Sequence, residues 1–418
     1  MKNLILSSRK SFLARIQTRL ASEKIKKYFS GIIQFDYSNS LGDEDHSKKA
    51  WESHGFGIFT NTLSKKLLSK EVDIVVHSFK DLPVKRSKKL AYMCLEREDP
   101  RDIVLIKKSS LKKKKLVIAT SSPRREYYLK LLKDFLPYQN LKSEPIRGNI
   151  QTRLEKILIS NNQDGVFIAK AAIDRIFKYG EKVSLVEYKK FKSIFRKFEK
   201  IILPLSEFPS AAAQGCIALE FRKDDLKVKK VLNKINHIPS MEDCLMERKY
   251  LSKWGGGCAL DIGVTIENFL NNKVLFARGR DANTKKYFKE KKYLNKINSK
   301  KVKNVFPSNL SKYQMFQREL NDFSKKLDNK NLLLTRGNYK ETQSLKKASN
   351  ITTSGISTWK KINQKGILVN STLDGFGEDY REIEDYYKNK KAPTFKLTYK
   401  GNPFKSKYSI ISHYSLIP

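Results

Sequence analysis

Residues 115–132 read KLVIATSSPRREYYLKLL, and this order of residue types indicates the fold class. The short apolar run at 115–120 predicts a buried strand, because it is rich in β-branched residues. The hydroxyls of Ser121 and Ser122 can then cap a helix, and Pro123 suits the first helical position. A buried strand that leads straight into a capped helix is typical of an α/β sheet.

The same alternation continues on both sides of this stretch. Further strands are predicted at 72–78, 165–169 and 216–221, with helices at 131–138 and 152–160. After about residue 224 the pattern changes, and a helical stretch at 241–254 precedes strand-like runs at 261–267 and 273–281. We therefore expect an α/β protein with parallel or mixed sheets, followed by a smaller α+β domain and a last segment with short strands.

The length and composition allow a multidomain protein. The chain has 418 residues, of which 39% are hydrophobic, so it can bury the cores of two to four domains. Its longest apolar runs, such as 167–173, are far too short to span a bilayer, so we expect no membrane segment. The N-terminus has only a brief apolar run, too short for a secretory signal, and we expect a cytoplasmic protein.

The four cysteines show no CxxC pairing and no metal-ligand spacing to any of the five histidines. Neither a disulfide framework nor a metal site is therefore expected. The stretch LSKWGGGCALDIGV (251–264) places three glycines directly before Cys258. Glycine lets the backbone bend sharply or lets a bulky group come close, so Cys258 is either a thiol presented to a ligand or a small buried hydrophobe.

The chain is strongly basic, with 85 lysines and arginines against 43 aspartates and glutamates, a formal net charge of +42. One interpretation is a nucleic-acid-binding protein, because basic side chains neutralise phosphates. The other is a set of lysine-rich solvated faces, because the lysines lie in runs such as 112–115 with no nucleic-acid-binding motif between them. We favour the second interpretation and do not expect nucleic acid as a partner.

Polar side chains follow the predicted strand at 72–78, in the stretch VDIVVHSFKDLP (72–83). Ligands of α/β sheets bind at the carboxyl ends of strands, which is where Ser78, Lys80 and Asp81 lie. Pro83 then prevents the strand from continuing. Lys80 and Asp81 are either a ligand-binding cation and carboxylate or a local ion pair on a loop, and the residue types alone favour the ion pair.

Arginines gather at predicted loop-to-helix junctions, although lysine is the commoner basic residue of this chain. A helix N-terminus attracts anions, and a guanidinium there can bind a carboxylate or phosphate with two hydrogen bonds. The alternative is a set of solvated arginines. We favour recognition of several anionic groups, because the pattern recurs. The arginines concerned are Arg9, Arg124, Arg125, Arg147 and Arg153, and Ser11 and Gly148 belong to the same junctions.

Together these stretches resemble the porphobilinogen deaminase (hydroxymethylbilane synthase) family of tetrapyrrole biosynthesis. The match runs from about residue 3 to 325. Its six stretches occur in the same order as in the family, so a chance resemblance is not expected. It includes VHSFKDLP (76–83), EREDPRD (96–102), TSSPRRE (120–126), IRGNIQTRL (146–154), FPSAAAQGCIALEFR (208–222) and ERKYLSKWGGGC (247–258).

The resemblance implies two similar α/β lobes around a cleft, like those of periplasmic binding proteins, with a smaller α+β domain and a C-terminal extension. The lobe with the catalytic aspartate comprises 1–97 and 200–223, because the chain returns to it after completing the arginine-rich lobe at 98–199. The third domain, with the cofactor cysteine, is expected at 224–327 and the extension at 328–418. Members of the family are usually monomers.

The resemblance also implies a reaction and a set of site residues. Family members join four porphobilinogen molecules on a dipyrromethane cofactor, which is bound to a cysteine, and release the linear tetrapyrrole by hydrolysis. Cys258 matches that cysteine, Asp81 matches the catalytic aspartate, and Lys80 beside it is the second catalytic position implied. The cofactor-binding positions implied are Lys80, Asp81, Thr120, Ser121, Arg124, Arg125, Arg147 and Gly148, and the substrate-binding positions are Arg9, Ser11, Ser78, Arg147 and Arg153.

Other interpretations stay open at this point. The scaffold could serve a basic nucleic-acid-binding protein or a two-lobed ligand-binding protein without the chemistry. Phe56 in HGFGIF (54–59) stands where the family usually has a lysine. Residues 332–338 and 366–379 faintly resemble parts of uroporphyrinogen III synthase, which indicates either a degenerate or partial fusion to that enzyme or an extension that interacts with a partner, for which the synthase itself is a candidate. A purely structural extension is the alternative.

Overall fold

The structure is a computed structural model, and its residues form two units by their contacts. The first unit comprises Met1–Lys130, Asn140–Ile266 and Leu275–Lys291, and the second comprises Leu131–Gln139, Glu267–Val274 and Lys292–Pro418. Among the described residues, no helix is both long and apolar enough to cross a membrane. The residues that the structure describes are 3–38, 58–83, 87–254, 261–269, 272–281, 284–295, 317–322, 327–340, 342–381, 393–399, 401 and 405–417.

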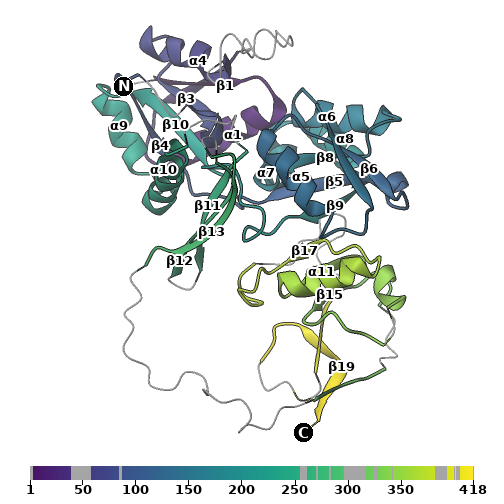
Figure 1. The fold of residues 1–418 in the computed structure, drawn as a ribbon. Coiled ribbons are helices and arrows are strands. Elements are labelled where there is room, and N and C mark those ends of the chain that lie inside the picture. The colour runs from purple at the N-terminus through teal and green to yellow at the C-terminus, as the bar shows by residue number, and fades with distance from the viewer. Residues whose placement is uncertain are drawn as a thin grey trace, which may run out of the picture. The chain divides into compact units, whose positions relative to one another are not determined.

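The first unit contains a five-stranded sheet with the strand order β2-β1-β3-β10-β4 (Figure 1). Strands β2, β1 and β3 are parallel, and β10 runs antiparallel to both β3 and β4. The strands β3 and β10 are apolar and buried almost throughout, so they form the centre of the core. The elements are β1 (Asn3–Arg9), β2 (Ile32–Ser38), β3 (Ile74–Ser78), β4 (Leu90–Cys94), β10 (Ile217–Arg222), α1 (Phe12–Ile25) and α4 (Ile58–Leu68).

A second five-stranded sheet of this unit repeats the pattern, with the order β7-β6-β8-β5-β9. Strand β6 is parallel to β7 and β8, and β5 is antiparallel to β8 and β9. The chain enters this sheet at β5 and returns to the first sheet at β10, and the expected mixed α/β fold is confirmed. The elements are β5 (Asp102–Lys107), β6 (Lys115–Ala119), β7 (Asn140–Glu144), β8 (Gly165–Ala169), β9 (Phe198–Ile202), α5 (Pro123–Leu132), α6 (Ile150–Ile159), α7 (Lys170–Val183) and α8 (Leu185–Phe195).

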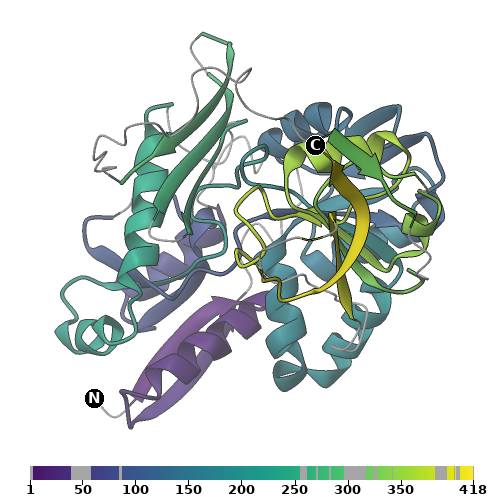
Figure 2. The same ribbon diagram turned by 90° about the horizontal axis from the view of Figure 1, so that it is seen from below.

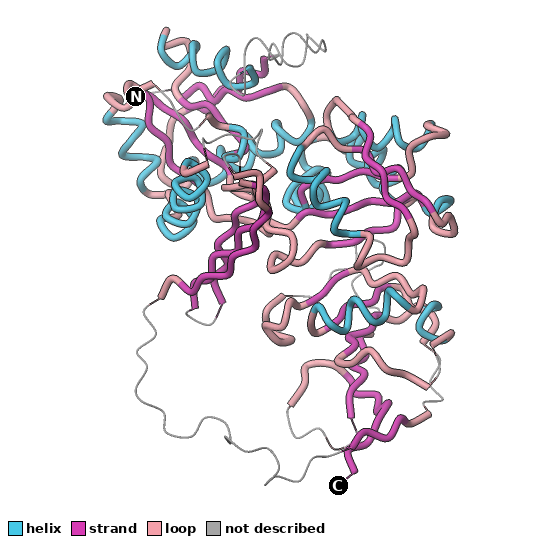
Figure 3. Tube along the Cα trace, in the orientation of Figure 1, coloured by secondary structure: helices cyan, strands magenta, loops and turns pink. Residues whose placement is uncertain are grey.

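A smaller sheet follows, with the order β11-β12-β13, and appears as an extended ribbon in Figure 3. Helix α10 lies alongside it (Figure 2), and the backbone N–H of Ile266 on β11 donates to Glu247 Oε1 on α10 at 2.6 Å. The elements are α9 (Leu226–Asn233), α10 (Ile238–Ser252), β11 (Gly263–Phe269), β12 (Asn272–Arg280) and β13 (Tyr287–Tyr293). This combination of helices and a small sheet matches the smaller α+β domain expected after residue 224.

The second unit contains a six-stranded sheet with the order β14-β19-β18-β15-β16-β17. Five strands are parallel, and β14 is antiparallel to β19. Trp359 and Ile362 of helix α11 are fully buried, and the Trp359 ring lies 5.3 Å from that of Phe135. The elements are β14 (Gln317–Leu320), β15 (Asn331–Leu334), β16 (Asn350–Thr353), α11 (Ile356–Gln364), β17 (Ser371–Thr372), β18 (Thr394–Tyr399) and β19 (Ser409–Ile417).

Two sequence expectations need comment. The helix predicted at 131–138 is wrong, because α5 ends at Leu132 and turns follow. Pro137 disfavours helical backbone at the residue before it, which excludes a helix across this stretch. The four-part domain division is finer than the two units and stays a prediction, and β14 belongs to the C-terminal sheet although it precedes residue 327.

Candidate functional site

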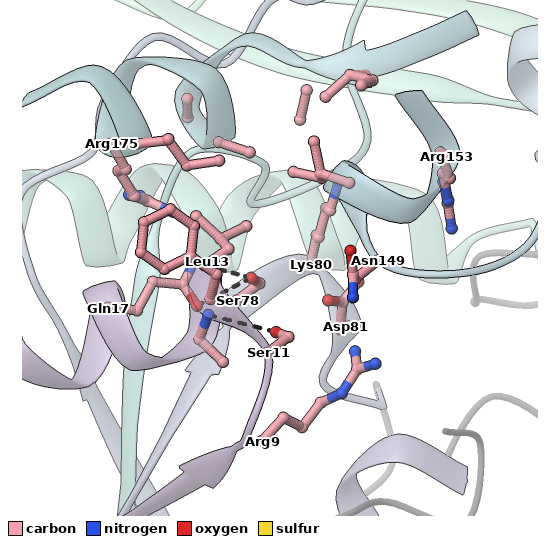
Figure 4. Close-up of a pocket in the computed structure, with 18 of the residues that line it drawn as sticks. Arg9, Ser11, Leu13, Gln17, Ser78, Lys80, Asp81, Asn149, Arg153 and Arg175 are labelled. Atoms are coloured by element: carbon pink, nitrogen blue, oxygen red, sulfur yellow. Dashed lines mark hydrogen bonds between the residues drawn. The ribbon is translucent and has the colours of Figure 1, made fainter. Parts of the chain in front are cut away.

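A cavity of about 580 Å³ lies in the first unit, where residues of both five-stranded sheets meet. Figure 4 shows Lys80 and Asp81 facing into it and the Arg9 guanidinium directed toward Asp81, and it places Arg153 on α6. Among the described residues that line the cavity, Asp81 is the one carboxylate, whereas six are lysines or arginines. The predicted site residues found on its wall are Arg9, Ser11, Ser78, Lys80, Asp81, Ser121, Arg125, Arg147, Gly148 and Arg153.

The position of Asp81 follows from the way β3 ends. A single 3₁₀ turn, Phe79–Asp81, follows the buried strand, and the backbone N–H of Phe79 donates to the carbonyl oxygen of Cys216 at 2.9 Å. The Phe79 ring is fully buried and lies 4.8 Å from that of Tyr92 in an edge-on contact. Because Phe79 anchors the turn in the core, the two polar residues after it are presented to the cavity.

Lys80 is held in a poorly hydrated place. Its Nζ donates to Gln214 Oε1 at 3.0 Å. Burial lowers the pKa of Lys80 to about 8, although the charge of Asp81 opposes this effect. Asp81 itself is exposed, so a ligand in the cavity can reach its carboxylate.

One buried carboxylate, outside the described cavity lining, holds two adjacent arginines. Asp102, at the start of β5, is fully buried and accepts hydrogen bonds from Arg124 Nη1 and Arg125 Nη2, both at 2.7 Å. Burial alone would raise the pKa of Asp102, but the two guanidiniums outweigh it and hold that pKa well below its usual range. Asp102 is therefore a buried anion that fixes the positions of both arginines.

The two arginines have different surroundings. Arg124 Nη1 also donates to the carbonyl oxygen of Pro209 at 3.1 Å, and Arg124 is not among the described residues that line the cavity. Arg125 does line it, and its Nε has no hydrogen-bond partner among the described residues. The structure thus places Arg125, and not Arg124, where a ligand carboxylate could bind it.

In the loop between β6 and α5, the Ser121 hydroxyl does not cap the helix as the sequence predicted. Ser121 Oγ donates to the carbonyl oxygen of Ile146 at 2.9 Å and accepts from the Ile146 N–H at 3.0 Å. Its hydroxyl thus joins two loops, although a helix cap was expected. Thr120 is buried and is not among the described residues that line the cavity, and its Oγ1 accepts from the N–H of Ser122 at 3.2 Å.

Two further arginines line the cavity at the start of α6: Arg147 in the turn before the helix and Arg153 in the helix itself. Gly148 has a φ of 116°, a conformation that glycine adopts without strain, and Asn149 caps α6 by accepting from the N–H of Thr152 at 3.0 Å. Arg153 Nε donates to the carbonyl oxygen of Gly148 at 2.7 Å. Burial and the nearby charge of Arg125 lower the pKa of Arg153 to about 10, which reflects the crowding of cations here.

Helix α1 supplies the opposite side of the cavity. Ser11 caps the helix, with its Oγ accepting from the N–H of Ala14 at 3.4 Å. Gln17, on the second turn, donates from Nε2 to Ser78 Oγ at 3.0 Å and so steadies the end of β3 (Figure 4). Arg9 precedes the cap at the end of β1 and faces Asp81.

Several cavity residues were not identified from the sequence as individual site residues. Gln17 lies within a regular helix, where a single polar residue in the sequence does not indicate a binding site. Arg175 is mostly paired, because its Nε contacts Glu98 Oε2 and its Nη2 donates to the carbonyl oxygen of Gly215, each at 2.6 Å. Gln214 belongs to a stretch that matched the family, but its own role was not predicted.

The four cysteines fall into two groups. Cys258, like Phe56, lies outside the described residues. Cys94, Cys216 and Cys244 are buried in one apolar cluster, where a hydrogen bond with Cys216 and burial raise the pKa of the Cys244 thiol well above its ordinary value. Among the described residues, no group of three or more histidine, cysteine, aspartate or glutamate side chains is arranged to hold a metal ion.

Comparison with known proteins gives consistent matches. A family model described as "Porphobilinogen deaminase, dipyromethane cofactor binding domain" matches residues 4–230. A porphobilinogen deaminase of Caldicellulosiruptor saccharolyticus is 36% identical over 269 residues, covering 63% of this chain and 84% of that protein. One from Rickettsia typhi is 31% identical over 269 residues (63% and 82%), and one from Nostoc sp. is 31% identical over 282 residues (66% and 80%).

Proposed function

The chain belongs to the porphobilinogen deaminase family, and we propose that it joins porphobilinogen units one at a time in the cavity beside Asp81. It is a transferase of tetrapyrrole biosynthesis, a hydroxymethylbilane synthase that uses the dipyrromethane cofactor of its family. The observation that carries the proposed site is the charge of the cavity wall, where, among the residues that the structure describes, one reachable carboxylate lies with six basic side chains.

The basic wall suits the substrate. Each porphobilinogen carries one acetate and one propionate group, so a growing chain of pyrroles accumulates carboxylates. Guanidinium groups bind carboxylates with charge-assisted hydrogen bonds, and they keep their charge when water is excluded. In the proposal, Arg9, Arg147 and Arg153 bind substrate carboxylates, with the hydroxyls of Ser11 and Ser78 assisting.

The residues present also fit the cofactor, whose two rings carry four carboxylates. Arg125 lines the cavity, and its Nε has no hydrogen-bond partner among the described residues. In the proposal Cys258 holds the cofactor covalently, while Arg125, Lys80 and Ser121 bind its acidic side chains. When bound, the cofactor supplies a free pyrrole α-carbon as the nucleophile for the first condensation.

Asp81 is proposed as the catalytic residue. Loss of ammonia from porphobilinogen leaves an electron-poor pyrrole whose nitrogen carries positive charge. A carboxylate fixed at that nitrogen stabilises this charge and can take up and return a proton. The anchored Phe79 turn supports this role, because a carboxylate that is already in position needs no reorganisation as the charge develops.

The test is the change Asp81→Asn, which keeps the shape of the side chain and removes its charge. We expect porphobilinogen consumption to fall by about 10²–10³-fold, because an amide cannot stabilise the cation as a carboxylate does. Asp134→Asn, the same change at an exposed position outside the cavity, is the matched control and should keep full activity. Consumption near the wild-type rate by a folded Asp81→Asn protein would rule out the proposed role.

A further inference from the structure

Gln214 joins the cavity wall to the buried carboxylate of Asp102. Gln214 is 1% exposed, and its Oε1 accepts from Lys80 Nζ at 3.0 Å. Its Nε2 donates to the carbonyl oxygen of Pro100 at 2.7 Å and to Asp102 Oδ1 at 2.9 Å. One side-chain amide therefore connects the ammonium at the cavity to the carboxylate that holds Arg124 and Arg125.

The backbone around Gln214 is closely constrained. Its N–H donates to the carbonyl oxygen of Ala211 at 2.9 Å. Ala213 has a φ of 63° and Gly215 a φ of 89°, so the turn uses left-handed conformations on both sides of Gln214. A Cβ on Gly215 would lie 2.4 Å from the carbonyl oxygen of Glu98. Such backbone persists only where its surroundings impose it, and the side-chain amide is therefore fixed in place.

The chemistry of the neighbours also fixes which end of the amide faces Lys80. The Pro100 carbonyl oxygen accepts hydrogen bonds and cannot donate, and the same is true of the ionised Asp102 carboxylate. If the amide turned over, its oxygen would face these two acceptors and its NH₂ would face the Lys80 donor. The observed orientation satisfies all three contacts, so Asp102 and Pro100 together aim the Gln214 oxygen at Lys80.

We propose that Gln214 is a positioning residue for the reaction, which holds the Lys80 ammonium at the cavity wall as a charged donor for the carboxylates of the bound pyrroles. The inference rests on the proposed function. It identifies Gln214 as a residue on which binding of the substrate carboxylates by Lys80 depends. Asp102 acts on Lys80 indirectly, because its carboxylate orients the Gln214 amide that binds Lys80. The same carboxylate also orients Arg124 and Arg125.

The charged groups around Lys80 determine how this role can be observed. Asp81 on the same turn and Asp102 on β5 favour the ammonium by their charges, whereas Arg125 and Arg124 on α5 disfavour it. Burial is the largest effect and lowers the pKa of Lys80 to about 8. A hydrogen bond to an acceptor stabilises the charged donor more than the neutral amine, so removing the Gln214 oxygen should lower that pKa further.

The experiment compares Gln214→Met with Gln214→Glu. In each protein, the reactivity of Lys80 toward an acylating reagent is followed against pH by peptide mass spectrometry, together with kcat and KM for porphobilinogen. We expect Gln214→Met to move the Lys80 titration down by about one pH unit, because the acceptor of its hydrogen bond is lost. Gln214→Glu should keep the titration near its wild-type position. Its second oxygen faces the Pro100 carbonyl oxygen and the Asp102 carboxylate, so the side chain is protonated there, donates to one of them and leaves a neutral oxygen for Lys80. The alkaline limb of kcat/KM should follow the Lys80 titration in both variants, chiefly through KM.

Gln163→Met, which removes an amide that donates to Glu144 Oε2 outside the cavity, is the control and should leave the Lys80 titration unchanged. A lower Lys80 titration in Gln214→Met that Gln214→Glu restores supports the inference, since a merely structural role would lower activity equally at every pH. A folded Gln214→Met protein whose Lys80 titrates as in the wild type overturns it. A wild-type protein that does not consume porphobilinogen contradicts the proposed function, while the titration of Lys80 still decides the role of Gln214.

Discussion

Glu247 is a buried carboxylate whose loss should cost this protein much of its stability, and Glu247→Gln is the informative change. The side chain is fully buried and each oxygen accepts two hydrogen bonds. Oε1 accepts from Arg97 Nη1 and the Ile266 N–H, both at 2.6 Å. Oε2 accepts from Arg97 Nη2 at 3.1 Å and the Ala213 N–H at 2.7 Å. These bonds join α10, which precedes Cys258, to β11, which follows it.

The cost of this change follows from these four bonds. An amide has one oxygen, so in either orientation its NH₂ would face one backbone N–H and one guanidinium N–H. A buried donor without an acceptor costs about 1–3 kcal/mol. Breaking a buried ion pair from one side costs about 3–5 kcal/mol. Because these costs overlap, we expect about 4 kcal/mol, a large part of the 5–15 kcal/mol that is typical of a folded protein.

Urea unfolding followed by tryptophan fluorescence measures the effect of Glu247→Gln. Glu242→Gln, at an exposed position on the same helix, should change the free energy of unfolding by less than about 0.5 kcal/mol. The double variant Arg97→Met/Glu247→Met should be more stable than either single methionine variant, because it leaves no buried charge without its partner. A Glu247→Gln protein within about 1 kcal/mol of the wild type would refute this reasoning.

Two further predictions concern Lys80 and the C-terminal extension. The pKa of folded Lys80 is about 8 against an ordinary value of 10.5, so between these pH values the unfolded chain binds more protons and the folded state gains stability as pH rises. The melting temperature of the wild type should therefore rise relative to that of Lys80→Met from pH 8 to 10.5, and parallel curves would contradict the lowered pKa. If residues 328–418 are a structural extension, the full chain incubated with porphobilinogen alone should give only the type I isomer of uroporphyrinogen. Formation of the type III isomer, measured by chromatography, would instead assign synthase activity to the extension.

The sequence predicted well what depends on neighbouring residues. The alternation of apolar runs and capped helices indicated the mixed α/β fold, and the polar end of β3 drew attention to Lys80 and Asp81. These signals are local, because the five residues of a strand and the residues of the turn that ends it are adjacent in the sequence. The same holds for Arg147 and Gly148 at the turn before α6.

What the sequence could not predict depends on contacts between distant residues. Asp102 and Gln214 are 112 positions apart, and only the folded chain shows that they share a hydrogen bond. The same contacts also give Arg124 and Arg125, which are adjacent and chemically identical, different surroundings. Ser121 had the residue type of a helix cap, but the approach of Ile146, 25 positions away, gave its hydroxyl other partners. The order of the six strands in the C-terminal sheet was likewise beyond any local pattern.

The covalent state of Cys258 is the most direct test of the whole account. The full-length protein, purified after expression in a host that makes porphobilinogen, is denatured and weighed intact by mass spectrometry. We predict a mass that exceeds the polypeptide by two pyrrole units, located on Cys258 by peptide mapping and absent from Cys258→Ala. A wild-type chain that turns over porphobilinogen at the polypeptide mass alone, or that carries the two units on another residue, would contradict the account.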